Sequence, residues 1–131
     1  MIIAVDFDGT LHDGNYPKIG NPKSGAISAM KKIKDDGHYI VIWTCREGEP
    51  QEKMIEWLKK KEIPYDTIND NNPSKTAEYK NNSRKVYADI YIDDKNILGI
   101  PSWNKIKEII IGNKKSNSRS YLIERAVLMI K

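Results

Sequence analysis

The sequence has few of the features that secreted or membrane-bound proteins need. Cys45 is the only cysteine in 131 residues, which excludes an internal disulfide framework and suits a reducing compartment. No apolar run approaches the roughly 18–20 residues that span a bilayer. Met1 leads directly into an apolar segment, so no signal or transit peptide is expected before it. We therefore expect a cytoplasmic protein without membrane contacts.

The sequence also shows no internal repeats and no second domain. Its 131 residues, 39% of them hydrophobic and 31% charged, are typical of one soluble domain with a real core. The net charge is +4, from 22 Lys and Arg against 18 Asp and Glu. This balance is compatible with a phosphorylated or nucleic-acid partner, although a solvated lysine-rich surface is the commoner explanation.

The most informative segment lies at the start of the chain. Residues 2–5 are apolar and mostly β-branched, which predicts a buried strand of a parallel sheet. Asp6 and Asp8 follow, and alternation along a strand would direct both carboxylates to one side. Gly9 then permits a sharp turn that brings backbone N–H groups close to a ligand. A surface turn rich in Asp and Gly is the alternative, but two close carboxylates that need a cation or a proton indicate an active site.

The rest of the chain alternates between predicted helices and strands. Strand, helix and strand in this order imply right-handed βαβ units, so we expect an α/β fold with a three-layer, doubly wound, mostly parallel sheet. The polar segment 69–84 is predicted to be an excursion with one helical turn at 76–79. The predicted helices begin near residues 22, 50, 101 and 121. The second and third predicted strands cover residues 38–43 and 63–68, and the segment 85–92 leads to a fourth strand.

Polar residues follow several of the predicted strands. Thr44 ends the strand 38–43, Asp93 and Asp94 end the fourth strand, and Lys85 begins the segment that leads into it. In an open α/β sheet, ligands bind at the carboxyl ends of the strands. We therefore expect these residues to lie near Asp6 and Asp8.

In order and spacing, these residues resemble the four motifs of the haloacid dehalogenase-like (HAD) phosphohydrolases. Residues 6–10 (Asp-Phe-Asp-Gly-Thr) are similar to the specific first motif, Thr44 to the second, Lys85 to the third and residues 92–94 to the acidic fourth. The similarity covers roughly residues 1–100. It implies a Mg²⁺-dependent phosphomonoester hydrolase that acts through an aspartyl-phosphate intermediate.

The resemblance also implies a role for each matching residue. Asp6 would be the nucleophile, and Asp8 would be the general acid and base. Thr44 would bind a phosphoryl oxygen, and Lys85 would neutralise charge on the phosphate and on Asp6. The implied substrate-binding positions are Gly9, Thr10, Cys45 and Arg46. The implied metal ligands are Asp6, Asp8 (through its backbone carbonyl), Asp93 and Asp94.

Alternatives remain open at several of these positions. Lys75 competes with Lys85 for the phosphate-neutralising role, and the sequence does not decide whether Asp93 or Asp94 is the main metal ligand, although the family pattern favours Asp94. Arg46 is either a contact for a substrate anion or part of a surface salt bridge. Cys45 has no neighbouring base that would make it a nucleophile. His12 is interpreted as structural or without a role.

The spacing of the motifs leaves no room for the cap domain that many HAD enzymes carry. We expect a small, capless domain with its core at 1–112, a polar linker at 113–118 and a C-terminal helix at 119–131 that packs on the core or mediates a homo-oligomer. The open site would admit a small phosphorylated molecule or an exposed phosphate on a macromolecule. A polynucleotide-end phosphatase is an alternative, as is a non-enzymatic phospho-receiver, but Trp43, Trp57 and Trp103 fit core positions better than base-stacking positions.

Overall fold

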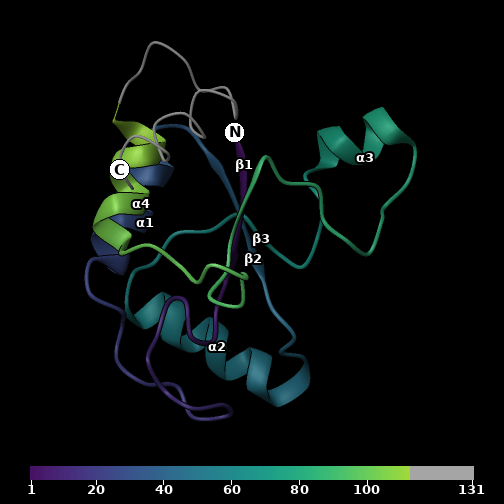
Figure 1. Cartoon of the computed structure of the whole chain (residues 1–131). Coiled ribbons are helices and arrows are strands. Elements are labelled where there is room, and N and C mark those ends of the chain that lie inside the picture. The colour runs from purple at the N-terminus through teal and green to yellow at the C-terminus, as the bar shows by residue number, and fades with distance from the viewer. Residues whose placement is uncertain (113–131) are drawn as a thin grey trace.

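The computed structural model describes residues 1–112, which alternate between strands and helices (Figure 1). The predicted linker at 113–118 and helix at 119–131 lie outside the described residues. In chain order, the elements are β1 (Ile2–Asp6), α1 (Ala26–Asp35), β2 (Tyr39–Trp43), α2 (Gly48–Lys60), β3 (Thr67–Ile68), α3 (Pro73–Tyr79), β4 (Ile90–Ile92) and α4 (Trp103–Ile111).

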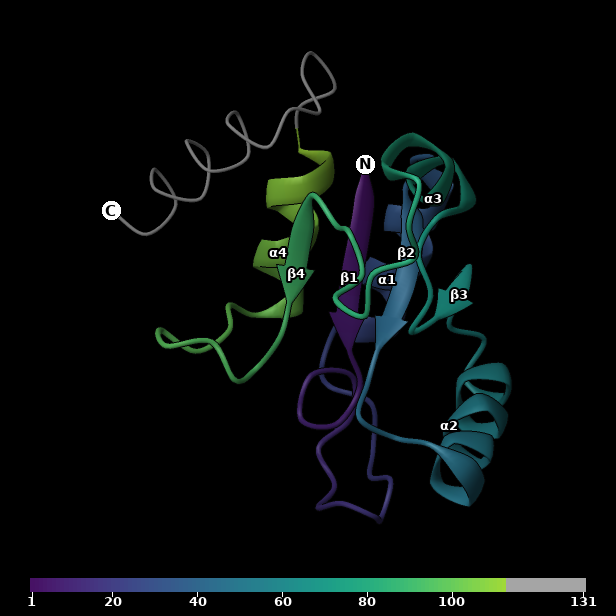
Figure 2. The ribbon, with the colours of Figure 1, turned by 90° about the vertical axis from the view of Figure 1, so that its right-hand side faces the viewer.

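The four strands form one parallel sheet in the order β3-β2-β1-β4. Asp6 at the end of β1 is in register with Trp43 at the end of β2, and Val5 is in register with Ile92 of β4. The strands therefore end at a common edge (Figure 2). β2 and β4 lie on either side of β1, because the connections that lead to these two strands both return beside it. The acidic segment after β1 therefore lies in the middle of that edge.

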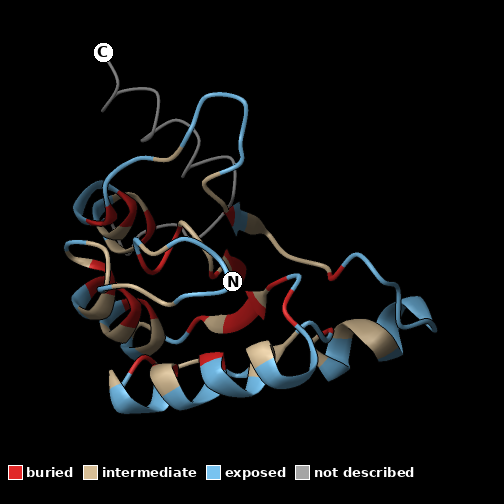
Figure 3. Cartoon of the chain, turned by 90° about the horizontal axis from the view of Figure 1, so that it is seen from below, coloured by how far each residue is buried: buried red, intermediate tan, exposed pale blue. Residues whose placement is uncertain are grey.

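Alternation along the strands divides the apolar residues between the two faces of the sheet. Ile3 and Val5 of β1 join the main core cluster, whereas Ile2 and Ala4 belong to a smaller cluster with Val86. The main cluster also contains Met54 and Leu58 of α2 and the inward residues of α1 and α4. Figure 3 shows buried residues along the inner side of α2 and exposed residues on its outer side.

The two faces of the sheet are covered unequally. α1 and α4 pack together on one side, and α3 lies on the other, as Figure 1 shows. α3 has no buried residue, and most of the cover on its side comes from the coil around Val86 to Ala88. The three-layer α/β fold with a parallel sheet is confirmed, with a thin third layer. In residues 1–112 no helix is long and apolar enough to cross a membrane.

Some predicted boundaries differ from the structure. The third strand is shorter than 63–68, because residues 63–66 pair with the sheet only through scattered hydrogen bonds. In the segment 85–92, only residues 90–92 form the strand. The excursion contains a longer helix than the single turn predicted, since Asn72 caps α3 through a hydrogen bond from the Ser74 N–H group. Trp103 and Trp57 pack against the core as predicted, and Trp43 is half-buried against the smaller cluster.

Candidate active site

Three carboxylates converge at the carboxyl edge of the sheet. Asp6 ends β1, and Asp93 and Asp94 follow β4, the neighbouring strand. One oxygen of each lies within 4.8 Å of the others, and all three side chains are half-buried. Asp93 also accepts a hydrogen bond from the Lys95 N–H group, so it shapes the turn as well. Hard carboxylate oxygens at this spacing fit a divalent cation such as Mg²⁺.

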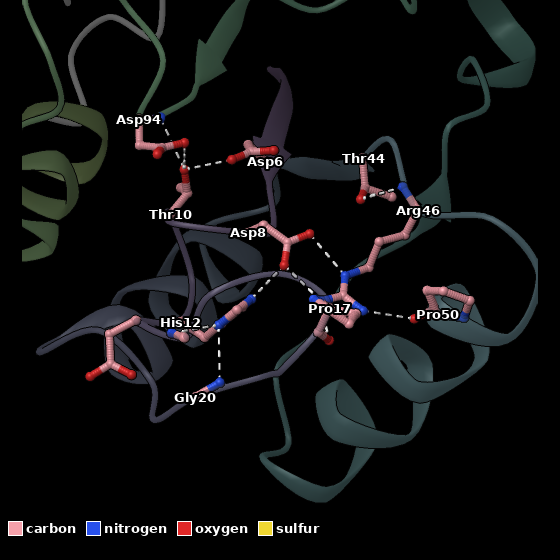
Figure 4. Close-up of polar contacts among 12 residues, drawn as sticks. Asp6, Asp8, Thr10, His12, Pro17, Gly20, Thr44, Arg46, Pro50 and Asp94 are labelled. Carbon is pink, nitrogen blue, oxygen red and sulfur yellow. Dashed lines mark hydrogen bonds and ion pairs between the residues drawn. The ribbon is translucent and has the colours of Figure 1, made fainter.

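Thr10 joins β1 to the Asp94 turn. Its hydroxyl donates to Asp6 Oδ2 at 2.9 Å and lies 3.3 Å from Asp94 Oδ1, while it accepts a hydrogen bond from the Asp94 N–H group at 3.0 Å (Figure 4). The Thr10 carbonyl in turn accepts a buried hydrogen bond from the Trp103 indole at 2.8 Å. The loop after β1 is therefore fixed to both β4 and α4.

Gly9 allows the loop to approach Asp94 closely. Its φ of +81° lies in the left-handed region, and an added Cβ would contact Asp94 Oδ2 and lie 2.9 Å from Asp94 Cγ. Both the backbone conformation and the carboxylate position therefore require a residue without a side chain here.

The protonation of Asp6 reflects its crowded surroundings. Burial raises its pKa, the hydrogen bond from Thr10 partly offsets this, and the neighbouring carboxyls of Asp94 and Asp93 raise it further, to about 7. Without a cation, Asp6 is therefore only partly ionised near pH 7. A bound cation would favour the ionised form instead, which is the form a nucleophile needs.

Asp8 points to a different set of partners. The chain turns after Phe7, whose carbonyl accepts hydrogen bonds from the N–H groups of Thr10 and Leu11. The sequence predicted that strand alternation would align Asp8 with Asp6, but β1 ends at Asp6 and the turn changes the direction of Asp8. The Asp8 carboxylate faces Arg46 and His12 (Figure 4). Burial would raise the pKa of Asp8, but the hydrogen bonds from Arg46 and His12 outweigh burial and hold it below its usual range.

Arg46 and His12 are both buried beside the Asp8 carboxylate. Arg46 is only 2% exposed, so a surface salt bridge is wrong, and its guanidinium is engaged with Asp8. His12 is fully buried and donates to Asp8 Oδ1 at 2.8 Å. In the sequence, this contact was indicated by the separation of four residues between Asp8 and His12, which keeps the two side chains close together.

Thr44 is held at the end of β2 by Asn69. The Thr44 N–H group donates to Asn69 Oδ1 at 2.8 Å, and Asn69 Nδ2 donates to the Thr44 carbonyl at 2.7 Å. The Thr44 hydroxyl accepts a hydrogen bond from the Arg46 N–H group at 3.1 Å. Asn69, whose φ is +52°, was not singled out from the sequence; an asparagine directly after a strand, where left-handed backbone is tolerated, was the signal available.

The remaining predicted residues are more exposed. Cys45 is an exposed loop residue. Lys85 is exposed, and its Nζ lies 5.3 Å from the centre of the Tyr91 ring. Lys75 Nζ lies 3.0 Å from Glu78 Oε2 and 4.5 Å from the centre of the Tyr87 ring. In the described part of the chain neither ammonium group forms an ion pair with Asp6, so the choice between the two lysines stays a prediction.

The convergent acids lie at the carboxyl edge of β1 and β4, where open parallel α/β sheets bind their ligands. Comparison with known proteins agrees: the model of the haloacid dehalogenase-like hydrolase family matches residues 3–112. The chain belongs to this family, as the four motifs indicated.

One solved structure is also similar. It is that of a conserved protein from Bacteroides thetaiotaomicron, with 38% sequence identity and a TM-score of 0.77, and the match covers 88% of this chain and 93% of that one. A search of curated proteins gave no match.

Proposed function

We propose that this protein is a Mg²⁺-dependent phosphomonoesterase that forms an aspartyl-phosphate on Asp6. The observation that carries the proposal is the cluster of Asp6, Asp93 and Asp94, in which a half-buried carboxylate at the end of the central strand faces two further acids. Membership of a hydrolase family supports the reaction class. The oxygen donors of this cluster fit Mg²⁺, and Asp93 and Asp94 would hold it together with Asp6.

The chain's own residues divide the reaction into two displacements. In the first, an Asp6 oxygen attacks phosphorus, an oxygen–phosphorus bond forms that makes Asp6 an acyl phosphate, and the bond to the leaving oxygen breaks. Thr10 orients Asp6 by donating to Oδ2, which leaves Oδ1 for attack. In the second, water attacks the same phosphorus, the Asp6–phosphorus bond breaks and inorganic phosphate leaves. When bound, Mg²⁺ would offset the charge of the carboxylates and of the phosphoryl group.

Asp8 would move the protons of both displacements. As the carboxylate, it takes a proton from the attacking water; as the acid, it gives one to the leaving oxygen. Its ground-state contacts with Arg46 and His12 suit the carboxylate form. To act as the acid, Asp8 must bind a proton in spite of these donors. Acidic leaving groups depart without needing that proton, so we expect their esters to react fastest.

Hydrolysis of p-nitrophenyl phosphate tests the proposal. Wild-type protein should release p-nitrophenol with Mg²⁺ and not with EDTA, and Asp6→Asn should fall to the background rate. Asp35→Asn is the matched control, because Asp35 is an exposed acid on α1 outside the acidic cluster. A folded wild-type protein that is no more active than Asp6→Asn, while it binds beryllofluoride with Mg²⁺ and keeps it, would support a phospho-receiver instead.

A further inference from the structure

We infer that Arg46 and His12 are positioning residues that hold the Asp8 carboxylate in its working orientation; the inference rests on the proposed function. Three N–H donors reach the two Asp8 oxygens. Arg46 Nε donates to Oδ2 at 2.8 Å, Arg46 Nη2 donates to Oδ1 at 2.7 Å, and His12 Nε2 donates to Oδ1 at 2.8 Å. A bidentate guanidinium fixes the plane of a carboxylate as well as its position.

The guanidinium of Arg46 is itself fixed on all sides. Nη2 donates to the Pro17 carbonyl at 3.0 Å and Nη1 to the Pro50 carbonyl at 3.1 Å, so the loop after β1 and the first turn of α2 both hold it. The Phe7 and Tyr16 rings lie 5.3 and 4.9 Å from its central carbon. An arginine with these contacts is not free to follow a substrate anion, but it is well placed to orient Asp8.

The imidazole of His12 has a single tautomer in this arrangement. Nδ1 accepts hydrogen bonds from the N–H groups of Gly14 and Gly20, at 3.0 and 3.1 Å, so the ring hydrogen is on Nε2 and is donated to Asp8. A Cβ on Gly20 would lie 2.8 Å from Gly14 Cα, which explains why both positions are glycine. The loop is thus folded around His12 to present one N–H group to Asp8.

Exposure indicates on which side Asp8 is free. The side chains of Arg46 and His12 are 1% and 0% exposed, whereas that of Asp8 is 27% exposed. The donors therefore lie behind the carboxylate, and its open side faces the solvent. Arg46 also donates its backbone N–H to the Thr44 hydroxyl, so the same residue connects Asp8 with the predicted phosphate-binding threonine.

The way in which the reaction rate depends on the leaving group distinguishes a positioning role of Arg46 and His12 from a purely structural one. General acid–base catalysis contributes about 10²–10⁴-fold when the leaving group needs a proton. Arg46→Lys and His12→Gln each keep a donor for Asp8 but change its geometry. With Mg²⁺, kcat/KM of both variants should fall at least roughly tenfold for an alkyl phosphate and stay within roughly threefold of wild type for 2,4-dinitrophenyl phosphate. This constant reports the steps up to release of the leaving group, and only the alkyl leaving group needs the acid there.

Two controls make the experiment decisive. Lys53→Met removes an exposed cation from α2 and should leave both esters unaffected. On an Asp8→Asn background, Arg46→Lys should cause no further loss with the alkyl ester, because it acts through Asp8. Folded variants whose kcat/KM falls equally on both esters, or falls further without Asp8, would overturn the inference while the proposed function stands. A wild-type protein inactive toward both esters would overturn the proposed function and the inference with it.

Discussion

At the scale of single residues, the site depends on how the surroundings of Asp6 and Asp8 differ. Asp6 lies among other acids and has a pKa of about 7, whereas Asp8 lies among nitrogen donors and has a pKa below its usual range. Two carboxylates of one short motif thus favour opposite protonation states. The proposed roles need the reverse of these preferences, so a bound cation would have to ionise Asp6, and Asp8 would have to gain a proton against its donors before it acts as the acid.

The raised pKa of Asp6 makes stability depend on pH and on metal. Its pKa is higher in the folded protein than its ordinary value of 3.8, so the stabilisation is complete below that value and is lost as pH rises through about 7. Asp8 acts in the opposite sense and only at acid pH, because its stabilisation is lost as pH falls below the usual range. Urea unfolding of the metal-free protein should therefore show that, from about pH 5 to about pH 8, the free energy of unfolding of wild type falls relative to that of Asp6→Asn. This comparison cancels the effect of His38, whose pKa is lowered by burial and which acts in the opposite sense.

Addition of Mg²⁺ should remove the loss of stability that the ionisation of Asp6 causes at higher pH. The cation binds best when all three carboxylates are ionised, so it should stabilise the protein more at about pH 8 than at about pH 5. Asp6→Asn, which cannot titrate, should lose this part of the pH dependence. Equal stabilisation by Mg²⁺ in wild type and Asp6→Asn would contradict the assignment of the metal site.

Gly9→Ala should disrupt the site more than it disrupts the fold. The left-handed φ costs an alanine about 1–2 kcal/mol, and the new Cβ would displace the Asp94 carboxylate. We expect a small decrease in the urea midpoint together with a loss of Mg²⁺-dependent hydrolysis. Gly37→Ala is the matched control: its φ is +90°, but a Cβ there meets nothing within 4 Å. If Gly37→Ala lost as much activity, the contact with Asp94 would not be the cause.

At the scale of elements, the sheet places the acids and the irregular segments orient them. β1 and its neighbours follow from apolar runs, and the ends of parallel strands must share an edge, so Asp6, Asp93 and Asp94 could be brought together from the sequence alone. The orientation of Asp8 could not, because it depends on a turn after Phe7 and on Arg46, which is 38 residues further along the chain.

The polar excursion after β3 shows the same limit. Its composition correctly indicated little burial, since α3 has no buried residue. Asn71, which is 6% exposed, holds the excursion in place. Its side chain donates hydrogen bonds to Asn82 Oδ1 and the Ser83 carbonyl and accepts one from the Tyr87 N–H group. Side-chain hydrogen bonds of this kind have no periodicity, so a pattern-based reading does not find them.

Of the two lysines that compete for the third motif, Lys75 lies in this excursion and Lys85 follows directly after it. Lys85 precedes Val86, which packs on Ile2 and Ala4 of the central strand, whereas Lys75 lies on α3 and pairs with Glu78. We therefore expect Lys85→Met to lower kcat with p-nitrophenyl phosphate by roughly a hundredfold, the typical cost of losing one electrostatic contact to the transition state. Lys75→Met should have a much smaller effect. A reversed order of the two variants would assign the role to Lys75.

At the scale of the whole molecule, the site lies at an open sheet edge. The connection after β1 is a loop, and the connection between β2 and β4 holds only α2, β3 and α3, so neither position carries a cap domain. Substrate choice would therefore rest on the loops around the site, including the coil after β4, where Ile97 and Leu98 are almost fully exposed. The capless architecture could be predicted from the spacing of the motifs, because spacing limits what can be inserted.

The central claim is that phosphate is transferred to Asp6, and chemical trapping tests it most directly. Protein turning over a phosphate ester with Mg²⁺ would be quenched and treated with borohydride, which reduces an aspartyl-phosphate to homoserine. Mass spectrometry of the peptide that contains residues 6–10 should then find homoserine at position 6, and aspartate there when substrate or Mg²⁺ is omitted. Steady hydrolysis without modification at Asp6, or with modification at Asp8, Asp93 or Asp94 instead, would contradict the account.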